Sequence, residues 1–291
     1  MDAPLLIAIM GPTASGKTAV AEALAAEHKL QLINADAFQV YRGLDIGTAK
    51  SPHRDDYEML DLVDPADEYG VGRWILQVAS LLQDLHRDGR GAVVVGGSGH
   101  YIRALFERFT DMATSPDPDL RAAIQSRELA DVFAELKARN PAAAARVDAL
   151  NPIRVRRALE RLDSPRLEWS IPEFRQVKIG LLLPHEILKD RINRRVLQMI
   201  DEGWVEEVKH LREIGVKRSD PGMRAHGYRA LFDVVENVLS LADAVEQTAT
   251  EVRQYAKRQR TWLRAEPNLA TIEAVDEGTA LAEARKLVWG V

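Results

Sequence analysis

Eight consecutive residues near the start of the chain have the types and spacing that bind phosphate groups. They are Gly11, Pro12, Thr13, Ala14, Ser15, Gly16, Lys17 and Thr18, which fit the pattern G-x-x-x-x-G-K-[ST]. In such a loop, backbone N–H groups and the N-terminus of the following helix surround an anion. Lys17 would add a positive charge beside the outer phosphates, and the Thr18 hydroxyl would ligate Mg²⁺. The stretch therefore predicts a phosphate site with a magnesium ion.

The residues on either side of this loop support the same interpretation. Residues 5–10 form a short apolar run typical of a buried parallel strand. Residues 18–28 are rich in Ala and Glu, which favour a helix. An ordinary glycine-containing turn is the alternative, and the agreement between the loop and its flanks argues against it.

A carboxylate follows the second predicted strand. Residues 30–33 predict this strand, which ends at Asn34-Ala35-Asp36. Because the carboxyl ends of parallel strands face the ligand crevice, we expect Asp36 near the phosphate loop. There it would ligate a metal ion or act as a general base. A helix N-cap is the alternative role for this residue.

A second glycine-rich turn, Gly96-Gly97-Ser98-Gly99, follows the strand predicted at residues 91–95. The turn would approach the same ligand or let a helix pack tightly on the strand, and both interpretations stay open. A motor-type NTPase usually ends such a strand on an acidic residue that holds Mg²⁺ and orients the attacking water. This strand ends on glycines, which argues against that chemistry.

The composition is that of a globular α/β protein. The chain has 291 residues, of which 46% are apolar and 29% are charged, and its formal net charge is −5. Nucleic-acid binding would therefore have to rest on local basic clusters. The absence of cysteine excludes disulfides, thiol chemistry and the usual structural zinc sites. With no signal peptide and no apolar run near the ~18 residues of a membrane span, we expect a cytoplasmic protein without a membrane partner.

The alternation of strands and helices predicts a parallel α/β sheet. Beyond the segments above, the pattern predicts strands at 59–63 and 177–183 and helices at 71–87, 185–201, 203–214, 226–240 and 243–264. Residues 113–170 predict a small helical insertion with breaks at Asn140-Pro141 and Asn151-Pro152. The core domain would then comprise residues 1–112 and 171–291.

Two predicted helices carry clusters of basic residues. The last helix of the insertion contains Arg154, Arg156, Arg157 and Arg161, and the helix at 243–264 interleaves cations with Tyr255 and Trp262. Such surfaces bind a phosphate backbone and stack bases. A solvated face, or an amphipathic helix docked on a core, is the alternative in each case.

Seven blocks in order resemble one family over nearly the whole chain. They are GPTASGKT at 11–18, NADAFQVYRGLDIGTAK at 34–50, VVGGSGHYIRAL at 94–105, NPIRVRRALE at 151–160, RRVLQMIDEGWVEEV at 194–208, HGYRAL at 226–231 and RQYAKRQRTWLR at 253–264. With these blocks the chain resembles the tRNA dimethylallyltransferases, also called tRNA isopentenyltransferases, of the bacterial type. The glycine loop is shared by many families, whereas the YRG-DIGTAK and AKRQ-TW-R patterns are far more specific.

The resemblance implies transfer of a dimethylallyl group from dimethylallyl diphosphate to N6 of the adenosine 3′-adjacent to the anticodon of certain tRNAs, with release of diphosphate. It implies a P-loop kinase-like parallel sheet, whose loop elsewhere binds ATP and other nucleotides and here holds the leaving diphosphate with Mg²⁺. By family position, Lys17 and Arg195 would stabilise the leaving group. Asp36 would take the N6 proton, and Ser98 would contact the flipped adenosine.

The resemblance also implies a tRNA-binding surface. Arg154 and Arg157 would hold the anticodon arm, and the residues at the modified nucleoside would be Asp36, Ala37, Phe38, Gln39 and Ser98. The chain departs from the family where Ala37 replaces the usual Ser, Phe38 replaces Met or Ala, and His100 replaces Leu. The segment after Glu160 is also shorter than in typical relatives, and no zinc-finger extension is present. We expect a monomer.

Two other function classes use some of the same features. A small-molecule kinase would use the same loop, and it would show phosphoryl transfer from Mg–ATP. A non-catalytic tRNA-binding protein would carry a degenerate site, as Ala37 and the short insertion suggest. The presence of Lys17, Thr18 and Asp36 together argues against degeneracy.

Overall fold

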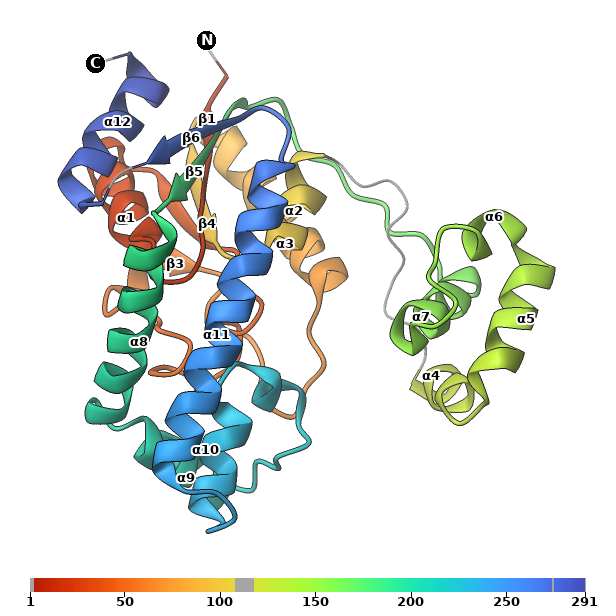
Figure 1. Cartoon of the computed structure of the whole chain (residues 1–291). Helices are drawn as coiled ribbons and strands as arrows, with labels where there is room; N and C mark the ends of the chain where they lie inside the picture. The colour runs from red at the N-terminus through yellow and green to blue at the C-terminus, as the bar shows by residue number, and fades with distance from the viewer. Residues whose placement is uncertain (1–2, 108–117, 274, 291) are drawn as a thin grey trace. The chain divides into compact units, whose positions relative to one another are not determined.

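The computed structural model describes residues 3–107, 118–273 and 275–290 (Figure 1). The chain divides into two compact units, one comprising Met1–Glu107 with Ile171–Val291 and the other Arg108–Ser170. The domain boundary predicted between residues 112 and 113 lies outside the described residues. Each unit is described by itself below.

The first unit is built on one parallel sheet of six strands, in the order β3-β2-β4-β1-β5-β6. The strands are β1 (Leu5–Met10), β2 (Gln31–Asn34), β3 (Tyr57–Glu58), β4 (Ala92–Gly96), β5 (Arg175–Leu182) and β6 (Leu269–Glu273). β1 lies between β4 and β5, with Ile9 opposite Val95 on one side and Ile179 on the other. This central place explains its unbroken apolar run, because both of its faces are covered.

Helices cover both faces of the sheet (Figure 1). The helices of this unit are α1 (Lys17–His28), α2 (Val71–Arg87), α3 (Gly99–Phe106), α8 (His185–Asp201), α9 (Trp204–Glu213), α10 (Tyr228–Val235), α11 (Leu241–Arg264) and α12 (Glu277–Trp289), with short 3₁₀ turns η1 (Arg54–Asp56) and η2 (Pro221–Arg224). α1 and α12 pack on Ile7, Ile9 and Ile179 in the main core, while α2 and α3 lie across the sheet from them. None of the helices in the described ranges combines the length and apolar character that crossing a membrane requires.

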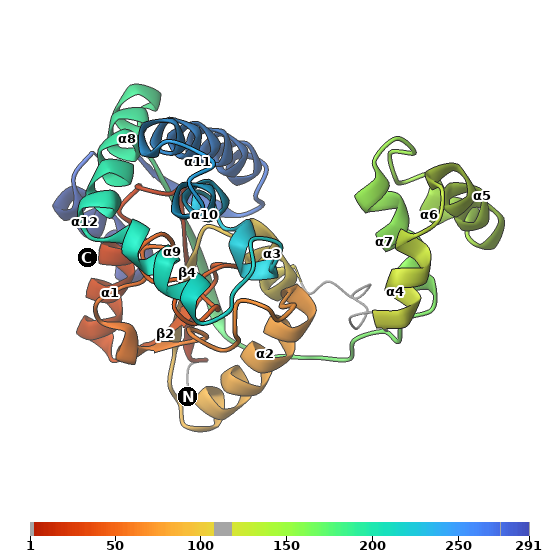
Figure 2. The ribbon, with the colours of Figure 1, turned by 90° about the horizontal axis from the view of Figure 1, so that it is seen from below.

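A second apolar core lies beyond the carboxyl ends of the strands. It joins α9, α10 and the start of α11 to the loop at residues 38–49, around Trp204 and Tyr228. α8 runs beside α11, and α10 packs on both α9 and α11 (Figures 1 and 2). These helices therefore form a wall beyond the carboxyl ends of the strands, where the phosphate loop lies.

The second unit is a helical domain with its own core. Its described helices are α4 (Pro118–Gln125), α5 (Leu129–Arg139), α6 (Pro141–Ala144) and α7 (Pro152–Leu162). The side chains of Asn140 and Asn151 cap α6 and α7 by accepting hydrogen bonds from the N–H groups of Ala143 and Arg154, at 2.9 and 3.1 Å. These caps confirm the two helix breaks predicted from Asn-Pro pairs.

Two predicted elements differ from the structure, and two observed elements were not predicted. The strand predicted at 59–63 is wrong, because β3 occupies Tyr57–Glu58 and the left-handed residues Met59 (φ 70°) and Asp61 (φ 51°) end it. The helix predicted at 226–240 is shorter, since Gly227 (φ 86°) precedes its start and Asn237 (φ 57°) follows its end. No element is predicted after residue 264, where β6 and α12 lie.

Candidate active site

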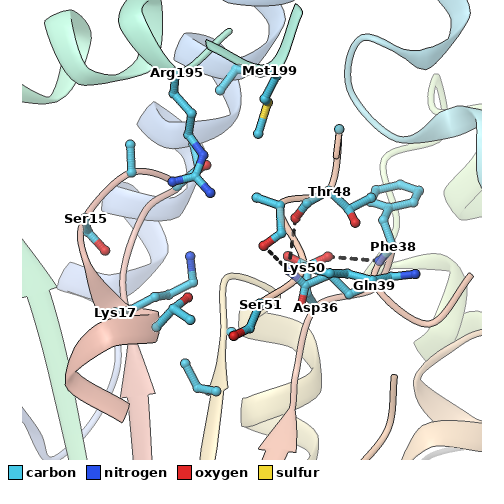
Figure 3. Close-up of a pocket in the computed structure, with 18 of the residues that line it drawn as sticks. Ser15, Lys17, Asp36, Phe38, Gln39, Thr48, Lys50, Ser51, Arg195 and Met199 are labelled. Atoms are coloured by element: carbon cyan, nitrogen blue, oxygen red, sulfur yellow. Dashed lines mark hydrogen bonds between the residues drawn. The ribbon is translucent and has the colours of Figure 1, made fainter. Parts of the chain in front are cut away.

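A cavity of about 360 Å³ opens at the carboxyl ends of β1, β2 and β4. Its walls come from the phosphate loop, the segment after β2, the loop at residues 47–52, α8 and α11. Lys17, Asp36 and Arg195 all line it, although they lie far apart in the sequence (Figure 3). The structure therefore brings together three of the four residues predicted to be catalytic.

Local geometry explains why both of these loop positions are glycine. A Cβ at Gly11 would lie 2.4 Å from the Ser15 Oγ, and Gly16 adopts a left-handed conformation at φ 86° just before α1. Within the described residues, the Ser15 hydroxyl is buried without a hydrogen-bond partner. A buried, unsatisfied hydroxyl is costly, and a bound phosphate oxygen would satisfy it. The loop therefore has the shape and the open donor of an anion site.

Two cations face this loop. Lys17 extends from the start of α1 and Arg195 from α8, and their side chains point into the same space (Figure 3). Burial lowers the pKa of Lys17 to about 8, opposed by the Asp36 carboxylate and assisted by the Arg195 guanidinium. Burial also lowers the pKa of Arg195. Two buried cations that face one cavity are unfavourable without a counter-charge, so their placement indicates that the cavity binds an anion.

The lowered pKa of Lys17 predicts a pH dependence of anion binding. Below about pH 8 the side chain is charged, so the affinity for inorganic diphosphate should fall as the pH rises through 8. Calorimetric titrations from pH 6.5 to 9.5 would measure it. Lys17→Arg, which stays charged over this range, is the matched control for titration of the diphosphate itself. Wild-type and Lys17→Arg affinities that change in parallel with pH would contradict the assignment.

Asp36 is fixed by its own backbone turn. Its Oδ1 accepts a hydrogen bond from the Phe38 N–H at 2.9 Å, and its N–H donates to the Asn34 Oδ1 at 2.9 Å. Oδ2 makes no hydrogen bond within the described residues, and the carboxylate lines the cavity. The local turn and the functional interpretation are therefore compatible, since each uses a different oxygen.

The second glycine turn packs against the Asp36 segment. A Cβ at Gly96 would lie 2.2 Å from the Ala35 carbonyl oxygen. The Ser98 Oγ accepts a hydrogen bond from the Ala37 N–H at 3.0 Å. Gly96 lines the cavity, and Ser98 is not among the residues that line it. The tight packing of this turn is therefore confirmed, whereas its approach to a ligand stays a prediction.

Phe38 and Gln39 lie at the rim of the cavity. The Gln39 Nε2 donates to the carbonyl oxygens of Thr48 and Ala49, at 2.9 and 3.2 Å. Phe38 is half-buried against the second core, with its ring centroid 6.5 Å from that of Tyr41. Ala37 contributes its N–H to Ser98. These side chains shape the loop beside Asp36, and their predicted contacts with tRNA stay predictions.

The DIGTAK block is held in place by α9 and α10. Glu207 accepts hydrogen bonds from the N–H groups of Asp45 and Ile46, at 2.9 and 2.7 Å, and from the Tyr228 hydroxyl at 2.6 Å. Burial raises the pKa of Glu207. A Cβ at Gly47 would lie 2.2 Å from the Trp204 ring, so only glycine fits there. Three sequence blocks therefore meet to build one wall of the cavity.

Lys50, at the end of the same block, is structural. Its side chain has no exposed surface, and its Nζ donates to the Tyr41 carbonyl oxygen at 2.7 Å and to Asp45 at 2.8 Å, with Asp61 also in contact. Its charge is therefore neutralised within the loop and is not directed at a ligand.

The predicted magnesium site would need ligands from the substrate as well as from the protein. Within the described ranges, no cluster of three or more His, Cys, Asp or Glu side chains would hold a metal ion. Thr18 and Asp36 line the cavity together with Glu22 and Glu277, so a hydroxyl and a few carboxylates are at hand. Mg²⁺ typically binds one or two carboxylates together with substrate phosphates and water. The residues present fit that mode.

Arg154 and Arg157 are both exposed on α7 of the second unit, whereas Val155 and Leu159 face its core. Arg156 instead donates to the Arg127 carbonyl oxygen at 3.0 Å and is structural.

Arg154→Ala should reduce the slope of log affinity for tRNA against log salt by about one unit or less. A salt titration measures it. Equal slopes for wild type and Arg154→Ala would show that Arg154 has a structural role and does not contact tRNA.

Sequence reasoning gave no individual role to three residues that line the cavity, His226, Tyr255 and Gln259. His226 and Tyr255 lie with ring centroids 4.7 Å apart, and burial lowers the pKa of His226. The sequence signal that could have identified Tyr255 and Gln259 is the cation–aromatic pattern of the 253–264 block. The polar residues of this block point to the sheet as well as to solvent.

A parallel sheet with a glycine loop after its central strand, and two cations in its cavity, is the arrangement of a P-loop protein. The IPP transferase family model matches residues 39–266, and the isopentenyl transferase model matches residues 4–61. The chain belongs to the IPP transferase family, whose named relatives are tRNA dimethylallyltransferases.

The similarity extends over nearly the whole chain. The tRNA dimethylallyltransferase of Bifidobacterium longum subsp. infantis is 36% identical over 291 residues, covering 93% of this chain and 87% of the relative. tRNA dimethylallyltransferase 2 of Syntrophus aciditrophicus is 36% identical, with coverages of 100% and 98%. The crystal structure of a full-length tRNA isopentenylpyrophosphate transferase from Bacillus halodurans superimposes with a TM-score of 0.73 at 33% identity, covering 98% of this chain and 96% of that one.

Proposed function

We propose that this protein transfers a dimethylallyl group from dimethylallyl diphosphate to N6 of the adenosine 3′-adjacent to the anticodon in certain tRNAs, releasing diphosphate. The observation that carries the proposal is the convergence of Lys17, Arg195 and Asp36 in one cavity. The two cations suit a leaving diphosphate, and the Asp36 carboxylate suits a proton acceptor. The relatives' names supply the substrate class.

The reaction needs one bond to form and one to break. N6 attacks the allylic carbon C1, while the C1–O bond breaks and its electron pair leaves on the diphosphate oxygen. The loop N–H groups, Lys17 and Arg195 stabilise that developing charge. The Oδ2 of Asp36, which is free of protein hydrogen bonds in the described part of the chain, takes the N6 proton. Magnesium bound by Thr18 and the diphosphate would add further positive charge at the leaving group.

The macromolecular partner is tRNA, bound at the anticodon arm. The exposed Arg154 and Arg157 of α7 provide positive charge for its backbone. The target adenine must leave its stack to reach the cavity, as in other base-modifying enzymes. A cytoplasmic monomer with no membrane partner completes the proposal, and light scattering after size exclusion would test the oligomeric state.

The decisive experiment is incubation with dimethylallyl diphosphate, Mg²⁺ and bulk tRNA, followed by digestion and nucleoside mass analysis. We expect adenosine carrying one dimethylallyl group in place of a hydrogen. A parallel incubation with Mg–ATP and no prenyl donor tests for phosphoryl transfer. Release of phosphate from ATP without any prenylated nucleoside would instead favour a kinase.

A further inference from the structure

Gln259 on α11 makes two hydrogen bonds through its amide, one as an acceptor and one as a donor. Its Oε1 accepts from the Thr13 N–H of the phosphate loop at 3.0 Å, and its Nε2 donates to the Gly97 carbonyl oxygen at 2.9 Å. The residue is only 2% exposed. A carboxylate would lack the donor, and a thioether would lack the donor and offer only a weak acceptor, so this position depends on one acceptor and one donor in one side chain.

The two partners of Gln259 belong to different halves of the reaction centre. Thr13 lies in the loop that would hold the diphosphate. Gly97 precedes Ser98, whose Oγ accepts from the Ala37 N–H at 3.0 Å beside Asp36. A short chain of hydrogen bonds therefore runs from the leaving-group loop, through Gln259, to the segment that carries the base.

The packing around Gln259 leaves it little freedom. A Cβ at Gly97 would lie 2.2 Å from the Gln259 Nε2, so the glycine turn and the amide are in close contact. α11 is itself anchored, because Arg260 donates to the Leu183 carbonyl oxygen at 3.0 Å and Arg253 to the Asn193 Oδ1 at 2.6 Å. Gln259 thus projects from a fixed helix and touches both loops at once.

We propose that Gln259 is a positioning residue that sets the separation between the phosphate loop and the Asp36 carboxylate. This inference rests on the proposed function, because a displacement reaction requires the leaving group and the base in one fixed geometry. Misplacement by about 1 Å can slow such a step by about 10²-fold. Gln259 touches neither reacting atom and acts through Thr13 and Gly97.

The test uses Gln259→Glu and Gln259→Met. A glutamate carboxylate keeps the acceptor for the Thr13 N–H but has no donor for the Gly97 carbonyl oxygen, whereas methionine has no donor and only a weak acceptor. We expect the single-turnover rate to fall about 10²-fold in Gln259→Met, while tRNA binding stays near the wild-type level. Gln259→Glu, which keeps one of the two contacts, should be slowed as well.

Gln176→Glu is the matched control. Gln176 is exposed near the start of β5, at the end of the sheet opposite the cavity, and the rate of this variant should stay near the wild-type value. If Gln259 were purely structural, both Gln259 variants would have a lower unfolding temperature, but the folded enzyme would react at the wild-type rate. Rates within two-fold of wild type in Gln259→Met and Gln259→Glu would overturn the inference.

A second measurement separates this inference from the proposed function. If the wild-type protein forms no prenylated nucleoside, the function fails, but inorganic diphosphate binding still reports on the loop. Gln259→Met should then bind diphosphate about tenfold more weakly than wild type and Gln176→Glu equally well. Unchanged affinity in Gln259→Met would contradict the role of Gln259. If Gln259→Met does not fold, the single-turnover rate and the diphosphate affinity of Gln259→Glu test the same role.

Discussion

Lys17→Ala is expected to lower turnover by about 10²- to 10³-fold at saturating prenyl donor. The Lys17 ammonium points into the cavity with Arg195, where charge develops on the leaving diphosphate. Removing one such group from a buried site typically costs this factor, because the stabilisation is greater in the transition state than in the ground state. Steady-state rates of tRNA prenylation, with donor raised until the rate no longer changes, measure the effect.

Measuring the stability of Lys17→Ala shows whether its loss of turnover comes from unfolding. Because burial lowers the pKa of Lys17 in the folded protein to about 8, the unfolded chain binds more protons between about pH 8 and its ordinary value of 10.5. Lys17 therefore opposes folding below pH 8, and this effect fades as the pH rises through that window. Lys17→Ala should thus be at least as stable as wild type at pH 7. Lys189→Ala, an exposed change on α8, is the control. Near-normal turnover in Lys17→Ala would show that the phosphate loop does not stabilise the leaving group.

Asp36→Asn is expected to slow the chemical step by about 10²- to 10⁴-fold, the usual contribution of a general base. Asparagine keeps the shape of the side chain and the oxygen that accepts from the Phe38 N–H, so the turn should survive. The substitution removes the proton acceptor at N6. The measurement is a single-turnover rate with enzyme in excess, which separates chemistry from binding and release. Binding of tRNA should change little.

A capping aspartate provides the control for Asp36. Asp276 accepts from the Thr279 N–H at 2.8 Å at the start of α12. Asp276→Asn should leave the single-turnover rate at the wild-type value. If Asp36→Asn folds, binds tRNA and reacts within a few-fold of wild type, Asp36 is not the base. The sequence makes Ser98 and His100 the next candidates, but neither lines the cavity, so the base would have to be sought among the other residues that do.

The local signals in the sequence predicted the central elements of the fold well. The apolar run at Leu5–Met10, the helix at Val71–Arg87 and the helix at His185–Asp201 have the expected bounds. Long periodic helices and runs buried on both faces leave a clear pattern. β6 did not, because it is a short edge strand in which only Ile272 is buried.

The site was predictable only where its residues lie in one stretch. The loop pattern named Lys17 and Thr18, and the strand-end rule placed Asp36 beside them. Arg195 came from family resemblance, since nothing in a helix of alternating charges marks which cation faces the sheet. Gln259 makes its contacts with Thr13 and Gly97 across large sequence separations, and no local pattern encodes such partners. Contacts of this kind become visible only in three dimensions.

The strand order also determines when the site becomes complete during synthesis. β1 pairs with β5, yet the whole unit Arg108–Ser170 is made between β4 and β5. Thr13 and Gln259 are 246 residues apart, so at about 5–20 residues per second their contact forms roughly 10–50 s after the phosphate loop is synthesised. The helical unit, whose contacts are local, folds during this delay. The nascent chain therefore carries the phosphate loop for most of its translation before the site that uses it exists.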